Sequence, residues 1–124
     1  MSRYGLLRQT TLPQGATNSV AQFCRVIAKI LNKHSQTTRS YLDDVGVRGP
    51  SDDYGEEEGI PGVRRYMLEA LKTLDGVLAD GERAGITFSG AKSQWLMDGV
   101  NVVGYVCTRY GRSPDPKKIS HILK

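Results

Sequence analysis

The sequence predicts an α+β fold, in which two helices cover one face of an antiparallel sheet and a third, short helix follows. Segments 20–31 and 63–78 repeat apolar residues at steps of three and four, the spacing of an amphipathic helix. Shorter runs rich in β-branched and aromatic residues flank polar pairs and glycines, which is the pattern of β-hairpins. Because no linker separates these segments, helices and strands are expected to share one core.

The N-terminal part of the chain is expected to hold a strand and a helix. Residues Leu6–Leu12 form a short extended run that Pro13-Gln14-Gly15 closes. Asn18 or Ser19 can then cap an amphipathic helix that extends to residues 32–34.

A β-hairpin is expected next, followed by a loop and the second helix. Segments 37–42 and 45–48 are rich in β-formers and flank Asp43-Asp44, which places this pair at the hairpin tip. Segment 51–62 carries five acidic residues among Gly, Ser and Pro and is expected to be a solvated loop. The second helix follows and fades at 81–85, where glycines weaken it.

The C-terminal part is expected to add a small antiparallel unit and the third helix. Segments 86–88, 94–97 and 100–108 have the composition of strands, and 109–112 that of a turn. Asp115-Pro116 is a typical helix start, with an N-cap aspartate and a first-turn proline.

Composition narrows the function classes. With 124 residues, a net charge of +4 and a pI near 9.2, the chain suits one globular domain or part of one, and its charge slightly favours a polyanionic partner. Neither Cys24 nor Cys107 belongs to a C-x-x-C pair, which predicts two reduced, buried thiols in an intracellular protein. His34 and His121 lack metal-ligand spacing and are expected at the surface. No apolar run reaches membrane-spanning length, so no membrane partner is expected.

The adjacent carboxylates of Asp43 and Asp44 need a chemical explanation. Neighbouring negative charges repel each other, and a tight turn accounts for one aspartate better than for two. A magnesium ion offsets the repulsion, because Mg²⁺ binds one or two carboxylates together with phosphate oxygens and water. Two such ions can stabilise both the attacking and the leaving oxygen in nucleotidyl transfer. The pair therefore indicates a phosphoryl- or nucleotidyl-transfer site.

Further segments around the pair form a series in the order of the chain. They are Leu12-Pro13-Gln14-Gly15-Ala16-Thr17-Asn18-Ser19 with Phe23, then Tyr41-Leu42-Asp43-Asp44, Lys92 after 85–89, Val102-Val103-Gly104-Tyr105, and 111–119. In this order they resemble motif B, the catalytic hairpin (motif C), motif D, the primer grip (motif E) and the start of the thumb of gypsy-type LTR retrotransposon reverse transcriptases. The resemblance implies a partial polymerase palm, residues 1–98, followed by the primer-grip hairpin and the first thumb helix, residues 99–124.

The resemblance also implies residue roles in an RNA-directed DNA polymerase that uses Mg²⁺. Asp43 would bind the metal and Asp44 would assist at the same site. Gln14 and Gly15 would line the pocket of the incoming deoxynucleoside triphosphate, where a glycine lets the backbone approach closely. Tyr41 would lie at this nucleotide site against the primer end.

Two further groups are implied near the reacting strands. Lys92 would lie by the triphosphate and protonate the leaving pyrophosphate, although its residue type alone favours an ordinary surface lysine. Val103, Gly104 and Tyr105 would hold the primer strand, although they equally suit a buried β-edge.

The sequence departs from the family pattern in one important respect. Motif A would supply another aspartate before motif B, but no acidic residue precedes Asp43. The expected partners are therefore an RNA or DNA template with a DNA primer, deoxynucleoside triphosphates, and the rest of the polyprotein: fingers, motif A strand, RNase H and integrase. The chain alone is expected to be inactive and poorly soluble, with an unpaired edge at the hairpin. Its expected location is the cytoplasm, the nucleus or element particles.

An alternative is a catalytically inactive, element-derived remnant. Such a chain would bind nucleic acid or another protein through basic residues of the thumb side. These are Arg109, Arg112, Lys117 and Lys118.

Overall fold

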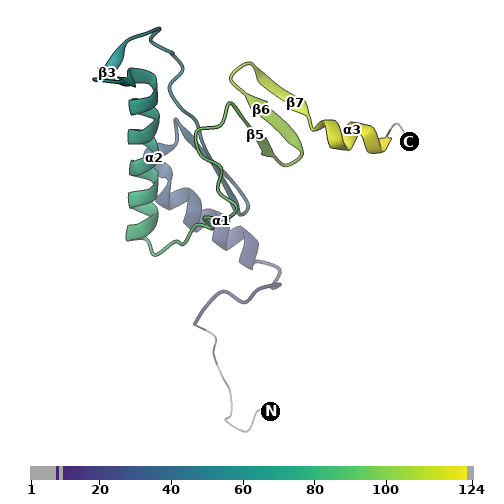
Figure 1. The fold of residues 1–124 in the computed structure, drawn as a ribbon. Coiled ribbons are helices and arrows are strands. Elements are labelled where there is room, and N and C mark those ends of the chain that lie inside the picture. Colours follow the sequence, from purple (N-terminus) through teal and green to yellow (C-terminus); the bar gives the residue numbers. More distant parts are fainter. Residues whose placement is uncertain (1–7, 9, 123–124) are drawn as a thin grey trace.

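A computed structural model describes residue 8 and residues 10–122 of the chain, an α+β arrangement of four helical segments and three β-sheets (Figure 1). Of the short strand or extended entry expected at Leu6–Leu12, residues 6, 7 and 9 lie outside the described residues, and residues 8 and 10–12 are not in a strand. The helical segments are α1 (Ser19–Ile30), the 3₁₀ helix η1 (Asn32–His34), α2 (Arg65–Arg83) and α3 (Pro116–Ile122). The strands are β1 (Thr38–Tyr41), β2 (Asp44–Val47), β3 (Glu58–Ile60), β4 (Val63–Arg64), β5 (Gly99–Val102), β6 (Tyr105–Thr108) and β7 (Gly111–Pro114).

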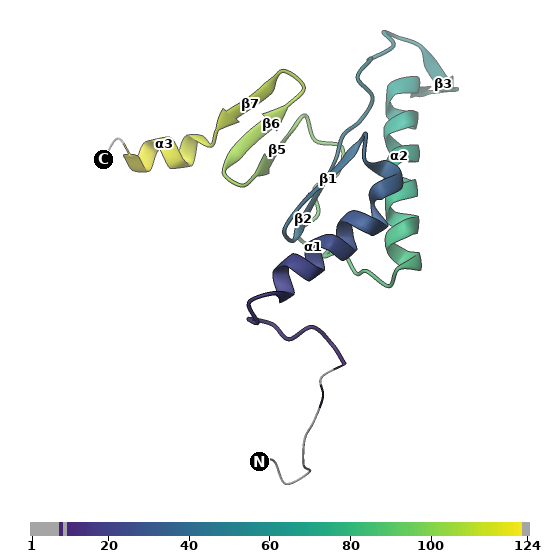
Figure 2. The ribbon, with the colours of Figure 1, turned by 180° about the vertical axis from the view of Figure 1, so that it is seen from behind.

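The strands form three separate antiparallel sheets, in the orders β1-β2, β3-β4 and β5-β6-β7. The α+β class is confirmed, but the expectation of one sheet under two helices is wrong. Each sheet pairs strands that are neighbours in sequence, because a short turn brings them together without a long connection. The β5-β6-β7 sheet and α3 extend away from α1 and α2 (Figures 1 and 2).

A small core joins α1, α2 and the β1-β2 hairpin. Ile27 and Leu31 at the end of α1 and Val77 of α2 are buried, and Val45 and Val47 of β2 pack against them. Full burial of one such side chain contributes about 1.5–3 kcal/mol, so three of them supply only a modest driving force. This core holds the hairpin against both helices.

The expected loop at 51–62 contains a short hairpin instead of being irregular throughout. β3 pairs with β4 across the turn at Pro61-Gly62, and Gly62 has a φ of 79°. A Cβ at Gly59 would lie 2.8 Å from the Leu68 side chain, so a glycine lets β3 lie directly on α2. The acidic composition hid this strand, because charged residues are rare in the strand pattern used for prediction.

Segments 86–88 and 94–97 were both expected to be strands, and neither is. Ile86 donates a backbone hydrogen bond to the carbonyl of Gly81 at 2.9 Å, and the Phe88 ring packs where Gly81 has no side chain. The first segment therefore folds back over the end of α2, which leaves its backbone unavailable for a sheet. The helix itself ends near the predicted position.

The C-terminal elements largely agree with expectation. The β5-β6 hairpin and α3 are confirmed, and Asp115 Oδ1 accepts the Lys117 N–H at 2.9 Å as an N-terminal cap. The turn expected at 109–112 is shorter, because Gly111 and Arg112 begin β7 and pair with β6. No helix in the described part of the chain is long and apolar enough to cross a membrane.

Candidate active site

The two aspartates lie at the tip of a β-hairpin, as the sequence predicted. β1 and β2 are paired from Thr38 opposite Val47 to Tyr41 opposite Asp44, which leaves Leu42 and Asp43 as a two-residue turn. Leu42 has a φ of 51°, in the left-handed region that side chains with a Cβ rarely occupy. The turn fixes Asp43 at the tip and Asp44 at the first position of the returning strand.

Both carboxylates are exposed to solvent. Neither forms an ion pair or a side-chain hydrogen bond within the described residues, 8 and 10–122. By contrast, Asp52 and Asp53 accept backbone N–H groups of the following loop at 2.9 and 3.1 Å. The loop aspartates therefore have a structural role that Asp43 and Asp44 do not share.

The hairpin tip lies toward the N-terminal end of α1. The chain reverses between α1 and β1, so β1 runs back toward the start of the helix (Figures 1 and 2). Gln14 and Gly15 form an exposed turn just before this start, in which Ala16 donates its N–H to the Pro13 carbonyl at 3.4 Å. Gly15 has a φ of 83° and open space where a Cβ would lie. The structure thus brings the turn and the hairpin tip to the same end of α1.

Tyr41 and Lys92 are both open to solvent. Tyr41 is 53% exposed at the end of β1, opposite Asp44 in the strand register. Lys92 lies in a turn in which the Ser89 carbonyl accepts the N–H groups of Lys92 and Ser93 at 3.2 and 3.0 Å. No ion pair involves Lys92 among the residues described. A lysine Nζ without a carboxylate partner is free to contact a phosphate.

The candidate primer-grip residues form the turn of the β5-β6 hairpin. Val103 and Gly104 have φ values of 50° and 78°, which is the pattern of a type I′ turn. The Gly104 carbonyl accepts the Asp115 N–H at 3.1 Å, and a Cβ at Gly104 would collide with the Lys118 side chain. Tyr105 lies under the Arg112 guanidinium at 5.4 Å. The turn therefore rests against the beginning of α3.

The donor chemistry of Asp43 and Asp44 fits a magnesium ion only as part of a larger set. Carboxylate oxygens are the protein ligands that Mg²⁺ prefers, and the ion commonly completes its shell with water and substrate phosphates. Within the described residues no cluster of three or more His, Cys, Asp or Glu side chains could hold a metal. Any ion here would need oxygens beyond this hairpin.

Comparison with known proteins gives one informative similarity. The chain is 33% identical over 121 residues, 97% of its length, to the Retrovirus-related Pol polyprotein from transposon opus of Drosophila melanogaster. This similarity supports a retroelement origin for the chain. The matched part is about 10% of that polyprotein, so the chain spans about a tenth of its relative. No protein-family model matches the chain, and no solved structure is similar to it.

Sequence reasoning missed two groups of interacting side chains. His34 was expected at the surface, but its side chain is only 20% exposed, and its Nε2 lies 2.9 Å from Asp80 Oδ2 of α2. The hydrogen bond from His34 lowers the pKa of Asp80, and the nearby Lys33 and Arg83 act in the same direction. A Cβ at Gly76 would lie 3.2 Å from the ring, so a helical glycine makes room for the histidine. The glycine at position 76 was the one sequence feature that could have indicated a histidine packed against this helix.

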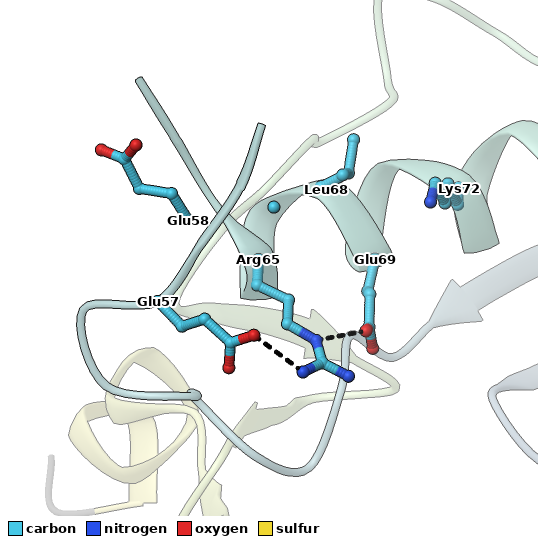
Figure 3. A pocket seen from close by; sticks show the side chains of 7 residues that line it. Glu57, Glu58, Arg65, Leu68, Glu69 and Lys72 are labelled. Atoms are coloured by element: carbon cyan, nitrogen blue, oxygen red, sulfur yellow. Dashed lines mark hydrogen bonds and ion pairs between the residues drawn. The ribbon is translucent and has the colours of Figure 1, made fainter. Parts of the chain in front are cut away.

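The second group ties the β3-β4 hairpin to α2. Arg65 lies between Glu57 and Glu69, with distances of 3.0 Å from Nη1 to Glu57 Oε1 and from Nε to Glu69 Oε1 (Figure 3). The Tyr54 hydroxyl donates to Glu69 Oε2 at 2.9 Å, and the Arg65 guanidinium stacks on the Tyr54 ring at 4.3 Å. These bonds lower the pKa of Glu69 and raise that of Tyr54. The adjoining hollow of about 260 Å³ is lined by Arg65 with its two carboxylate partners, together with Glu58, Gly59, Leu68 and Lys72.

The two cysteines differ from expectation in degree. Cys24 and Cys107 are both free thiols and half-buried instead of fully buried. Cys24 lies beside the core-facing stripe of α1, which explains its partial exposure in so small a core.

Proposed function

We propose that this chain is part of the palm of a retroelement RNA-directed DNA polymerase. The observation that carries the proposal is the two-residue turn of β1-β2, which presents the uncommitted carboxylates of Asp43 and Asp44 together. A structural role would leave at least one of them paired or capping, as Asp52 does in the acidic loop. The similarity to a Pol polyprotein and the order of the sequence motifs support the same assignment.

The chemistry follows from the side chains around the tip. When Mg²⁺ is bound, it neutralises developing negative charge on the oxygens of the reacting phosphate. Asp43 and Asp44 supply carboxylate oxygens that would hold it, since both are exposed and unpaired among the described residues. Tyr41, on the neighbouring strand, offers an exposed ring for packing against the primer end.

The remaining groups position the substrate and move a proton. The left-handed Gly15 leaves space in which a deoxynucleoside triphosphate can approach the backbone next to Gln14. The Nζ of Lys92 can donate a proton to the leaving pyrophosphate oxygen. The hairpin turn at Val103-Gly104, backed by α3, and the Tyr105 ring would hold the primer strand.

An exchange experiment tests this proposal. The matched segment of the transposon opus polyprotein is replaced by this chain, and RNA-templated primer extension is measured with Mg²⁺. We expect extension in the chimera and at least a hundredfold loss in Asp43→Asn. Glu57→Gln, a matched neutralisation in the acidic loop, should leave extension within twofold of the parent.

The outcome separates this role from the alternative. An Asp43→Asn chimera that extends as well as its parent contradicts a polymerase role for the hairpin. Tight template binding with no extension in any chimera would favour an inactive nucleic-acid-binding remnant.

A further inference from the structure

Positive charge is concentrated in the first third of the chain. Residues 1–42 contain six of the 17 Lys and Arg residues and no Asp or Glu, whereas the rest carries 11 basic and 13 acidic residues. The six are Arg3, Arg8, Arg25, Lys29, Lys33 and Arg39. Because this segment contains no acidic residue, any carboxylate that pairs with its cations, as Asp80 does with Lys33, comes from another part of the chain.

Two of these lysines meet a third cation in a hollow of about 370 Å³ between α1-η1 and the end of α2. We call it the basic hollow. Lys33 and Arg83 are 77% and 74% exposed, so their charges face solvent. The lining residues are Lys29, Ile30, Lys33, Asp80, Arg83 and Ala84.

One carboxylate, that of Asp80, pairs with two of the three cations of the basic hollow. The Asp80 side chain is only 13% exposed, and its Oδ1 lies 2.7 Å from Arg83 Nη1 and 4.0 Å from Lys33 Nζ. Its Oδ2 is occupied by His34 at 2.9 Å. Lys29 has no ion pair within the described part of the chain. The hollow therefore holds three cations and one carboxylate, and positive charge remains for a ligand.

We infer that the basic hollow binds the phosphate backbone of a single-stranded nucleic acid. Arg25 precedes Lys29 by four residues on α1, which spaces their charges about 6 Å apart along the helix. This extension of the charge along α1 suits a linear polyanion better than a compact one. A flexible single strand can enter a hollow between two helices, whereas a duplex is stiff over about 150 base pairs. The charged groups of Lys29, Lys33 and Arg83 would contact phosphates, which carry no sequence information, so binding should not depend on base sequence.

The basic hollow is distinct from the candidate active site. It lies where α1 ends and α2 ends, whereas the hairpin tip faces the beginning of α1 (Figure 1). Loss of binding at the hollow and loss of nucleotidyl transfer at Asp43 can therefore be measured separately.

The test uses the full chain and a fluorescein-labelled oligouridylate, with binding followed by fluorescence anisotropy. Three phosphate contacts predict that affinity falls about 18-fold between 50 and 200 mM salt, at a slope of about −0.7 per contact. In the Lys29→Gln/Lys33→Gln variant one phosphate contact remains, so the same increase in salt should lower the affinity only about threefold. The affinity of this variant at low salt should fall at least tenfold.

A matched variant controls for net charge. Arg64→Gln/Lys72→Gln also removes two positive charges, but neither residue lines the basic hollow. We expect its affinity to stay within twofold of the parent. An equal loss in both double variants, or no loss in either, overturns the inference, because charge alone or another surface would then explain binding.

Two further measurements test the binding site independently of the double variants. Lys29→Gln alone removes a charge that has no ion pair within the described residues, so its loss of affinity cannot arise from a broken contact with Asp80. Circular dichroism checks that each variant remains folded. Binding of poly-glutamate as tightly as RNA at the same salt would show a general anion surface and overturn the assignment to nucleic acid.

Discussion

The buried hydroxyl of Thr38 leads to a prediction that opposes simple intuition about polar residues. Thr38 begins β1, is only 3% exposed, and its Oγ1 has no hydrogen-bond partner among the described residues. A buried hydroxyl that loses its water partners without gaining a new one costs about 1–3 kcal/mol. Valine has nearly the same shape and places a methyl group where this oxygen lies.

The variant Thr38→Val should therefore raise the free energy of unfolding by about 1–2 kcal/mol, because it removes an unsatisfied polar atom and adds apolar burial. In a chain of this length such a gain corresponds to a rise in Tm of roughly 3–8 °C. Thr38→Ser keeps the hydroxyl and loses the buried methyl group, so it should lower stability by about 1 kcal/mol.

Urea unfolding followed by circular dichroism at 222 nm measures both variants under one condition. The two changes should have opposite signs. If Thr38→Val lowers stability as much as Thr38→Ser does, the hydroxyl has a partner in solution, and the reasoning from its isolation in the structure is wrong.

Three further predictions follow from other parts of the fold. The pKa of Asp80 is lowered chiefly by the hydrogen bond from His34, so this group stabilises the fold above the ordinary carboxylate pKa. That contribution is lost as pH falls through the lowered pKa, and Asp80→Asn should flatten the acid side of a stability–pH curve measured by urea unfolding. Gly104→Ala should lower stability by about 1 kcal/mol in thermal unfolding, because a residue with a Cβ is strained at a φ of 78° and the flexible Lys118 side chain must also move aside, whereas Gly90→Ala, with open space, should be near neutral. Residues 95–97 are 48–58% exposed, and we expect the purified chain to self-associate; a single monomeric mass by light scattering at all concentrations would contradict this.

Local sequence patterns predicted the elements that are held by neighbours in the chain. The α1 stripe ending at Leu31, the hairpin around Asp43-Asp44 and the cap at Asp115 all depend on residues within a few positions of each other. Such contacts leave a period of 3.6 or 2 in the sequence, which can be read without knowing the fold.

Contacts between distant segments were not predictable in the same way. The sheet arrangement depends on which element covers which, and Phe88 packs on Gly81 instead of joining a strand. The pairing of His34 with Asp80 joins residues 46 positions apart. The sequence around either residue does not indicate that the other is its partner. Glycine at position 76 gains its meaning only once the histidine ring lies over it.

The hairpin tip combines two local features that a purely structural turn would avoid. Leu42 adopts a φ of 51°, which costs about 1–3 kcal/mol in a residue with a Cβ, and glycine or asparagine would remove most of that cost. Directly after it come two aspartates, whose charges oppose each other and meet no cation within the described residues. The packing of Val45 and Val47 on the helices can hold this turn in place, but it does not require either feature. The metal-binding role proposed above for Asp43 and Asp44 would account for the unpaired charge at this turn, because a divalent cation binds carboxylate oxygens.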